Sequence, residues 1–168
     1  MMKKLVIFTV LMLNVLGAAS LYAEEKATPR EVFDMVVNAA GVLESLGEEG
    51  LAAFNDPKGE FTWKDTYVQV YNCEKRQVVG HPNAKLLTMP PEQWWNVQDK
   101  KGNYLTRNLC EASKNPYGAW VEYWWPKIGE TEPSRKITFI IQVPNTPYQV
   151  SAGIYDDKLS IEELNKIK

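Results

Sequence analysis

The chain has 168 residues, with 19 lysines and arginines against 21 aspartates and glutamates, one histidine and two cysteines. This weakly acidic balance excludes electrostatic binding of nucleic acid, and one histidine without a CxxC or CxxCH motif gives almost no support to a metal or haem site. The length suits one domain with a hydrophobic core of its own.

Residues 1–23 have the layout of a secretory signal peptide. A basic start, Met1–Lys4, precedes an apolar run over residues 5–16, and small residues lead to Ala23 before the charges begin. We expect cleavage after Ala23, with Ala19 or Ser20 as the alternative positions. The run is short for a membrane-spanning helix, although an uncleaved anchor is the other interpretation. Cleavage removes two lysines and no acids, so a periplasmic or secreted domain over residues 24–168 has a formal net charge of −4.

Cys73 and Cys110 are the two cysteines, and export would place them in an oxidising compartment. A disulfide between them would close a loop of 38 residues, which is worth roughly 3–4 kcal/mol in the chain-entropy treatment. The alternative is two separate buried thiols that pack as small apolar side chains. Spacing alone does not show whether the two Cβ atoms meet, so both interpretations stay open.

The exported part opens with a strong helix signal. Thr28-Pro29-Arg30-Glu31 is a capping box with proline at the first helical position. Apolar residues then recur at helical spacing as far as Leu46, and Gly47 is expected to end the helix. A second, shorter helix is predicted over Glu48–Phe54.

The period then changes to that of β-strands. Alternating residues predict a hairpin, and a long connection over residues 84–103 follows it, with Trp94 and Trp95. A helix capped by Asn103 and a three-stranded meander follow that connection. The predicted strands are 67–71, 77–80, 118–126, 135–143 and 148–155, and the predicted later helices are 103–113 and a short one from Ser160.

The strand at residues 118–126 holds four large aromatic residues within six positions. Alternation places Trp120, Glu122 and Trp124 on one face and Val121, Tyr123 and Trp125 on the other. Neither face is polar, so both should be covered. Buried tyrosine and tryptophan need partners for their polar tips, so a strand of this kind often borders a cavity. From the strand alone, rings that serve only as core are the simpler interpretation, and the rest of the chain favours the cavity.

These elements predict an α+β fold of the PAS-like type, with a long N-terminal helix packed on a five-stranded antiparallel sheet. The connection after the second strand can close over the concave face of such a sheet. A ligand site is expected there.

Six segments, in this order, resemble single Cache domains, and the resemblance extends from Pro29 to Asp157. They are residues 51–57, 67–71, 79–83, 118–126, the Arg135-Lys136 pair, and 152–156. The chain departs from the family pattern at the turn Asn72–Lys75 and at Tyr148, where a tryptophan is common. These changes lie at a turn and at a strand start and leave the identity of the ligand open.

The resemblance implies an extracytoplasmic sensing domain that binds small molecules, often small carboxylates. Most relatives are input modules of chemoreceptors, kinases or cyclases. The chain shows neither a second hydrophobic span nor an output domain, so we expect a free-standing exported protein that passes its ligand or conformation to a membrane sensor or a transporter. No cofactor is expected.

The expected pocket has an aromatic wall of Trp120 and Tyr123, closed by Trp94 or Trp95. The expected donors to a carboxylate are His81, Tyr123 and Lys136, where the resemblance also places polar pocket residues. Lys136 could instead be a solvated lysine at a strand end.

Two other classes of function compete with ligand binding. Catalysis has little support, because no nucleophile elbow, phosphate-binding loop or metal cluster occurs. An exported protein–protein interaction module is the stronger alternative, because tryptophan and tyrosine are enriched at interfaces.

Overall fold

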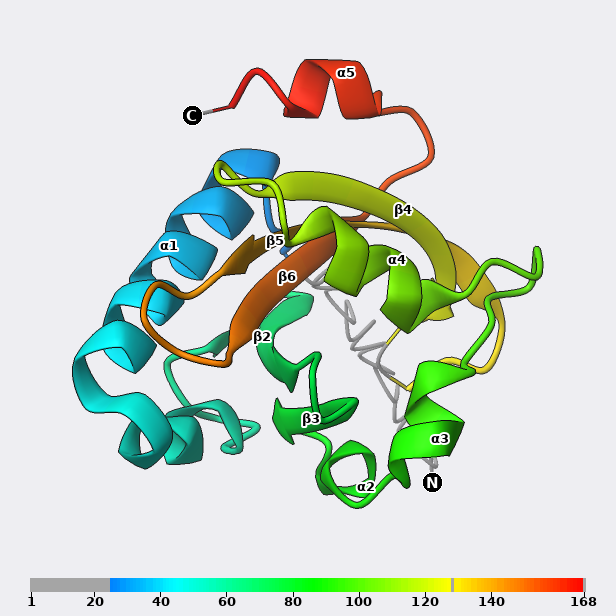
Figure 1. Ribbon diagram of the computed structural model, residues 1–168. Helices are drawn as coiled ribbons and strands as arrows, with labels where there is room; N and C mark the ends of the chain where they lie inside the picture. Colours follow the sequence, from blue (N-terminus) through cyan, green and yellow to red (C-terminus); the bar gives the residue numbers. More distant parts are fainter. Residues whose placement is uncertain (1–24, 128, 168) are drawn as a thin grey trace, which may run out of the picture.

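The computed structural model describes residues 25–127 and 129–167, and in them an antiparallel sheet lies between helices on its two faces (Figure 1). The strands follow the spatial order β1-β2-β6-β5-β4, and β3 pairs with the edge of β2 away from β6. The strands are β1 (Thr62–Trp63), β2 (Thr66–Asn72), β3 (Gln77–Gly80), β4 (Ala119–Pro126), β5 (Pro133–Gln142) and β6 (Gln149–Tyr155). The helices are α1 (Pro29–Leu46), the 3-10 helix η1 (Gly47–Phe54), α2 (Ala84–Leu87), α3 (Pro91–Trp95), α4 (Leu105–Ala112) and α5 (Ile161–Leu164).

The predicted α+β architecture is confirmed. The sequence predicts five strands, and the described residues contain a sixth, the two-residue β1, which pairs with the start of β2. The predicted helix over 48–54 forms as the 3-10 helix η1, and Ser160 caps α5 by accepting from the backbone N–H of Glu163.

Helix α1 begins where the sequence predicts because its first turn is capped in both directions. The backbone N–H of Glu31 donates to Thr28 Oγ1, and the backbone N–H of Thr28 donates to the Glu31 carboxylate over 2.8 Å. The helix ends at Gly47, whose φ of 57° favours glycine. Its buried stripe, formed by Val32, Val36, Ala39, Ala40 and Leu43, packs against β5 and β6.

The two faces of the sheet belong to two separate apolar clusters. One cluster lies between the sheet and α1 and includes Trp120 and Phe139. The other lies between the sheet and the connection from β3 to β4, and it includes Tyr123 and Trp94. Alternation along β4 therefore sends neighbouring aromatic rings to opposite sides, as the sequence predicts.

The connection from β3 to β4 carries α2, α3 and α4, which cover the face of the sheet opposite α1 (Figure 1). The prediction that Asn103 caps the last of these helices is wrong: α4 begins at Leu105 without a side-chain cap. Asn103 instead donates from its backbone and its side-chain amide to Asp99. Asp99 also accepts from the backbone N–H of Trp124, so this turn is fastened to β4.

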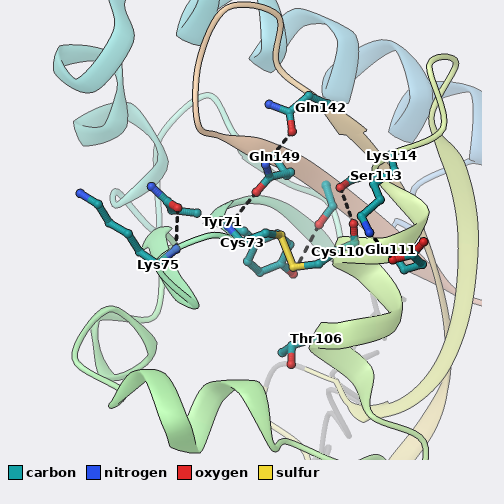
Figure 2. Close-up of a disulfide and its surroundings, with 12 residues drawn as sticks. Tyr71, Cys73, Lys75, Thr106, Cys110, Glu111, Ser113, Lys114, Gln142 and Gln149 are labelled. Carbon is teal, nitrogen blue, oxygen red and sulfur yellow. Dashed lines mark hydrogen bonds and ion pairs between the residues drawn. A yellow bond between two sulfur atoms is a disulfide. The ribbon is translucent and has the colours of Figure 1, made fainter.

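Cys73 and Cys110 form a disulfide, which confirms one of the two interpretations left open by the sequence (Figure 2). Cys73 begins the turn after β2, and Cys110 lies in α4. The bond therefore ties the covering connection to the end of a central strand.

Residues 1–24, which include the predicted signal peptide, lie outside the described residues, so its removal stays a prediction. Within the described ranges, every helix is too short or too polar to cross a membrane.

Removing the disulfide should lower the stability of the domain. The bond spans 37 positions of sequence, and a loop of that length is worth about 4 kcal/mol in the chain-entropy treatment. We therefore expect the Cys73→Ser/Cys110→Ser double variant to lose about 4 kcal/mol of unfolding free energy, as measured by urea denaturation. If the double variant matches the oxidised wild-type protein, the cysteines are not paired in the native protein.

Candidate functional site

A small cavity lies between the sheet and its covering connection. Its volume is about 40 Å³, which is room for roughly three water molecules. The sheet supplies most of the polar wall, from β2, β4 and β5, and the connection supplies most of the apolar wall. The lining includes Tyr67, Gln69, Tyr71, His81, Thr106, Tyr123 and Lys136 on the polar side and Leu86, Met89, Trp94, Leu109 and Trp125 on the apolar side.

Lys136 lies in the middle of the sheet, on β5. Its register partners are Tyr123 on β4 and Tyr155 on β6, so the lysine has a tyrosine on each side across the sheet. Its side chain is only 1% exposed. Gly153 leaves room for it, because a Cβ atom there would lie 3.1 Å from Lys136 Cε and 2.3 Å from Thr138 Oγ1.

The ammonium of Lys136 has no acidic partner in the described part of the chain. Among the described residues no carboxylate forms an ion pair with its Nζ, which instead donates to the Tyr67 hydroxyl over 3.4 Å. The Nζ atom also lies 4.5 Å from the ring centre of Tyr67 and 5.1 Å from that of Tyr155. Burial opposes the charged form of Lys136, whereas the nearby tyrosines Tyr67, Tyr123 and Tyr155 favour it, and the net effect raises the pKa of Lys136.

His81 follows β3 and is 3% exposed. Its Nδ1 accepts a hydrogen bond from the backbone N–H of Asn83 over 2.8 Å, so in the neutral ring the proton is on Nε2. That Nε2 atom is buried and has no hydrogen-bond partner. Burial, and then the nearby charge of Lys136, lower the pKa of His81 to about 3, so the ring is a neutral donor at ordinary pH.

Tyr67 lies between these two groups. Its ring centre is 4.7 Å from that of His81, and its hydroxyl accepts from Lys136. The cavity therefore presents a cation, a hydroxyl and an unpaired ring N–H close together. An unpaired buried donor costs free energy unless a ligand or water satisfies it.

Tyr123 and Tyr155, the register partners of Lys136, stay protonated at ordinary pH. Burial raises the pKa of Tyr123, and Lys136 partly opposes this effect. Burial likewise raises the pKa of Tyr155 to about 12. The hydroxyl of Tyr123 lies 2.8 Å from Thr138 Oγ1, and that of Tyr155 donates to the carbonyl oxygen of Pro126. Neither Tyr123 nor Tyr155 therefore supplies a negative charge to Lys136.

Four of the six candidate residues predicted from the sequence line this cavity: His81, Trp94, Tyr123 and Lys136. The alternative of Lys136 as a solvated lysine is excluded by its burial. Trp95 does not line the cavity; it contacts Trp94, with ring centres 6.2 Å apart, and lies beside the guanidinium groups of Arg76 and Arg107. Trp94 is therefore the tryptophan that closes the cavity.

The prediction that Trp120 shares a pocket with Tyr123 is wrong. Trp120 lies in the cluster on the α1 face, with its ring centre 5.2 Å from that of Phe139. The physical reason is the two-residue period of a strand, because positions three apart point to opposite faces.

Four further residues of this site are not among those predicted from the sequence: Tyr67, Gln69 and Tyr71, which line the cavity from β2, and Tyr155, which lies beside Lys136. Their signal is present in the sequence, since the three β2 residues alternate with Val68 and Val70. Alternation indicates that they share a face. It does not indicate that this face is the one that carries Lys136, which depends on the pairing of β2 with β6 and β6 with β5.

Comparison with solved structures shows the same fold in sensory domains. One, described as a Cache chemosensory domain that recognises carboxylic acids, is 20% identical, with a TM-score of 0.62 over 76% of this chain and 92% of its own. The periplasmic sensor domain of a chemotaxis protein is 24% identical, with a TM-score of 0.59 over 83% and 100%. A methyl-accepting chemotaxis protein from Vibrio parahaemolyticus RIMD 2210633 is 14% identical, with a TM-score of 0.60 over 78% and 90%.

The sequence itself matches a family model over nearly the whole described region. Residues 26–166 match the model of single Cache domain 2. This match includes α1, every strand and the covering connection. The chain therefore belongs to the single Cache domain 2 family.

Proposed function

We propose that this protein is a sensing or binding domain outside the cytoplasm, and that it holds a small monocarboxylate in the cavity beside Lys136. The observation that carries the proposal is the fully buried ammonium of Lys136 without a carboxylate partner. The chemosensory domain of the same fold that recognises carboxylic acids supports it.

The charge of Lys136 explains why the ligand would be an anion. Burial of an ammonium costs several kcal/mol, and the tyrosine hydroxyls and rings that oppose this cost form no ion pair with it. A bound carboxylate would supply the missing charge. Its oxygens would accept from Lys136 Nζ and from His81 Nε2, and charge-assisted hydrogen bonds of this kind are worth about 1.5–3 kcal/mol each.

The lining of the cavity explains the choice of a small acid with one charge. Lys136 is the single lysine or arginine among the residues that line it, so a second carboxylate would lack a partner. Leu86, Met89, Trp94 and Leu109 offer only apolar contacts to the rest of the ligand. The volume restricts a ligand to a few non-hydrogen atoms unless the connection moves.

The size of the ligand sets a ceiling on affinity. At about 1.5 kcal/mol per non-hydrogen atom, a four-atom acid gains at most about 6 kcal/mol, so its Kd should be no tighter than tens of micromolar. Such an affinity suits a sensor of nutrients better than a carrier that must retain its cargo. We therefore favour delivery of a signal to a membrane sensor over delivery of the acid to a transporter.

The aromatic residues give less support to the alternative of a protein-interaction module. Trp94 and Tyr123 are each 3% exposed, and in the free protein they already pack against the sheet and the connection. An interface would present such rings to solvent.

The first test replaces the charge of Lys136 with an apolar side chain of similar length. Lys136→Met should weaken binding of acetate or propionate at least about tenfold, because one charge-assisted hydrogen bond is lost. The melting temperature of the empty protein should change little, because methionine keeps the length and the apolar contacts of the lysine stem. Isothermal titration calorimetry and thermal unfolding measure the two effects.

Lys114→Met is the matched control, since the Lys114 side chain is 71% exposed and pairs only with Glu111 at the surface. It should leave acid binding unchanged. Equal acid affinity in Lys136→Met and the wild-type protein would contradict the proposal.

The second test concerns the neutral state of His81. With a pKa of about 3 in the folded protein and about 6.5 in the unfolded chain, His81 takes up a proton first in the unfolded state. Its contribution to stability is therefore complete above pH 6.5 and is lost as the pH falls toward 3.

Between pH 6.5 and 4 the wild-type protein should lose about 3 kcal/mol more unfolding free energy than His81→Asn, in which an amide oxygen replaces the Nδ1 acceptor. Urea denaturation at a series of pH values measures this difference, and the carboxylates common to both proteins cancel. Parallel curves would show that His81 is charged or hydrated in the folded protein, and would remove it as a neutral donor.

A further inference from the structure

A second, larger hollow adjoins the cavity. It has a volume of about 430 Å³ and lies between the β1–β2 hairpin, the residues after β3, and the end of β4. Pro57, Asn83 and Pro126 are among its walls. Nothing in the carboxylate proposal requires this space, because Lys136 does not line it.

The hollow and the cavity share four lining residues: Tyr67, His81, Leu86 and Trp125. A shared wall means that the two spaces are separated by side chains alone. Tyr67 and His81 are 6% and 3% exposed and are held by the contacts described above. Leu86 and Trp125 are partly exposed. They are therefore the two members of this wall that border both solvent and the cavity.

We infer that the hollow is the entrance to the cavity, and that the side chains of Leu86 on α2 and Trp125 on β4 form the gate between them. The element that carries Leu86 is less restrained than the one that carries Trp125. Helix α2 has a single turn, no buried residue and a cap formed only by Asn83, whereas Trp125 belongs to a strand paired along its length with β5. A change of the Leu86 rotamer, or a small shift of α2, opens the way.

An acid that enters through the hollow reaches the proposed donors His81 and Lys136 first. His81 and Tyr67 belong to the wall that the two spaces share, and Lys136 lies beyond Tyr67. The carboxylate is then exchanged from water to the N–H of His81 and to Lys136 without crossing the apolar side of the cavity. Leu86 and Trp125 accordingly set the size of acid that is admitted and the rate at which it leaves.

Met89 provides a matched control for Leu86. Both residues lie in the same short stretch of the connection, both are partly buried, and both line the cavity. Only Leu86 also lines the hollow. Truncation of either side chain enlarges the cavity, but truncation of Leu86 alone should open the gate.

The first experiment measures access without any acid, so it does not depend on the proposed function. Thr106 lines the cavity and is 3% exposed, and Thr106→Cys places a thiol inside it in the oxidised, disulfide-bonded protein. Labelling by methyl methanethiosulfonate, followed by mass spectrometry, should accelerate at least about fivefold when Leu86→Ala is added. Addition of Met89→Ala should leave the rate within about twofold.

Leu86→Phe separates gating from a loss of stability. A larger side chain should slow labelling of the Thr106→Cys thiol, whereas a destabilised protein would be labelled faster. Leu86→Val takes the place of Leu86→Ala if the latter does not fold. Equal labelling rates in all variants, or equal acceleration by Leu86→Ala and Met89→Ala, would overturn the gate.

The second experiment rests on the proposed function and uses acetate and butyrate with stopped-flow tryptophan fluorescence. Leu86→Ala should raise the association and dissociation rates of acetate together, so that its Kd changes less than about threefold. Butyrate should gain more in association rate than acetate does. If neither acid binds, the carboxylate proposal fails while the labelling result still decides the gate. If acetate binds with unchanged rates in Leu86→Ala, the gate fails and the site stands.

Discussion

The arrangement around the cavity depends on one constraint, the burial of a lysine ammonium among groups that carry no negative charge. Lys136 reaches the interior because β5 lies between two strands that each place a tyrosine beside it, and because Gly153 has no side chain in its path. Tyr67 and His81 complete the surroundings from the other side. A lysine, three tyrosines and a neutral histidine form an environment that a small anion would complete.

The covering connection is what makes this environment a cavity instead of an open sheet face. Its fastenings to the sheet include the disulfide to the end of β2 and the hydrogen bond from Trp124 to Asp99, and a bond from Thr106 to the carbonyl oxygen of Trp94 joins α4 to α3 within it. Tyr71 and Thr106, two residues of the cavity lining, lie close in sequence to Cys73 and Cys110 (Figure 2). Helix α2 has none of these fastenings, which is consistent with the place of the proposed gate.

The sequence predicts the local structure well and the site in part. The capping box at Thr28, the hairpin after β2 and the alternation in β4 are local signals, and the structure confirms all three. Tyr123 and Lys136 are register partners, because β4 and β5 are consecutive strands of the predicted meander and pair antiparallel. The place of Tyr155 follows from the second pairing of the same meander, β5 with β6. That of Tyr67 depends on the pairing of β2 with β6, two strands far apart in sequence, which short-range patterns do not encode. The predicted pocket includes Trp120, although the alternation of residues along β4 places Trp120 and Tyr123 on opposite faces of the sheet.

The most direct test of the central claim compares two ligands of nearly the same shape that differ in charge. Acetate and acetamide should be titrated calorimetrically into the wild-type protein at pH 7. We expect acetate to bind with a Kd between tens of micromolar and a few millimolar, and acetamide to bind at least about tenfold more weakly, because it has no charge to pair with Lys136. Acetamide binding as tightly as acetate would contradict the claim that the buried ammonium selects the ligand.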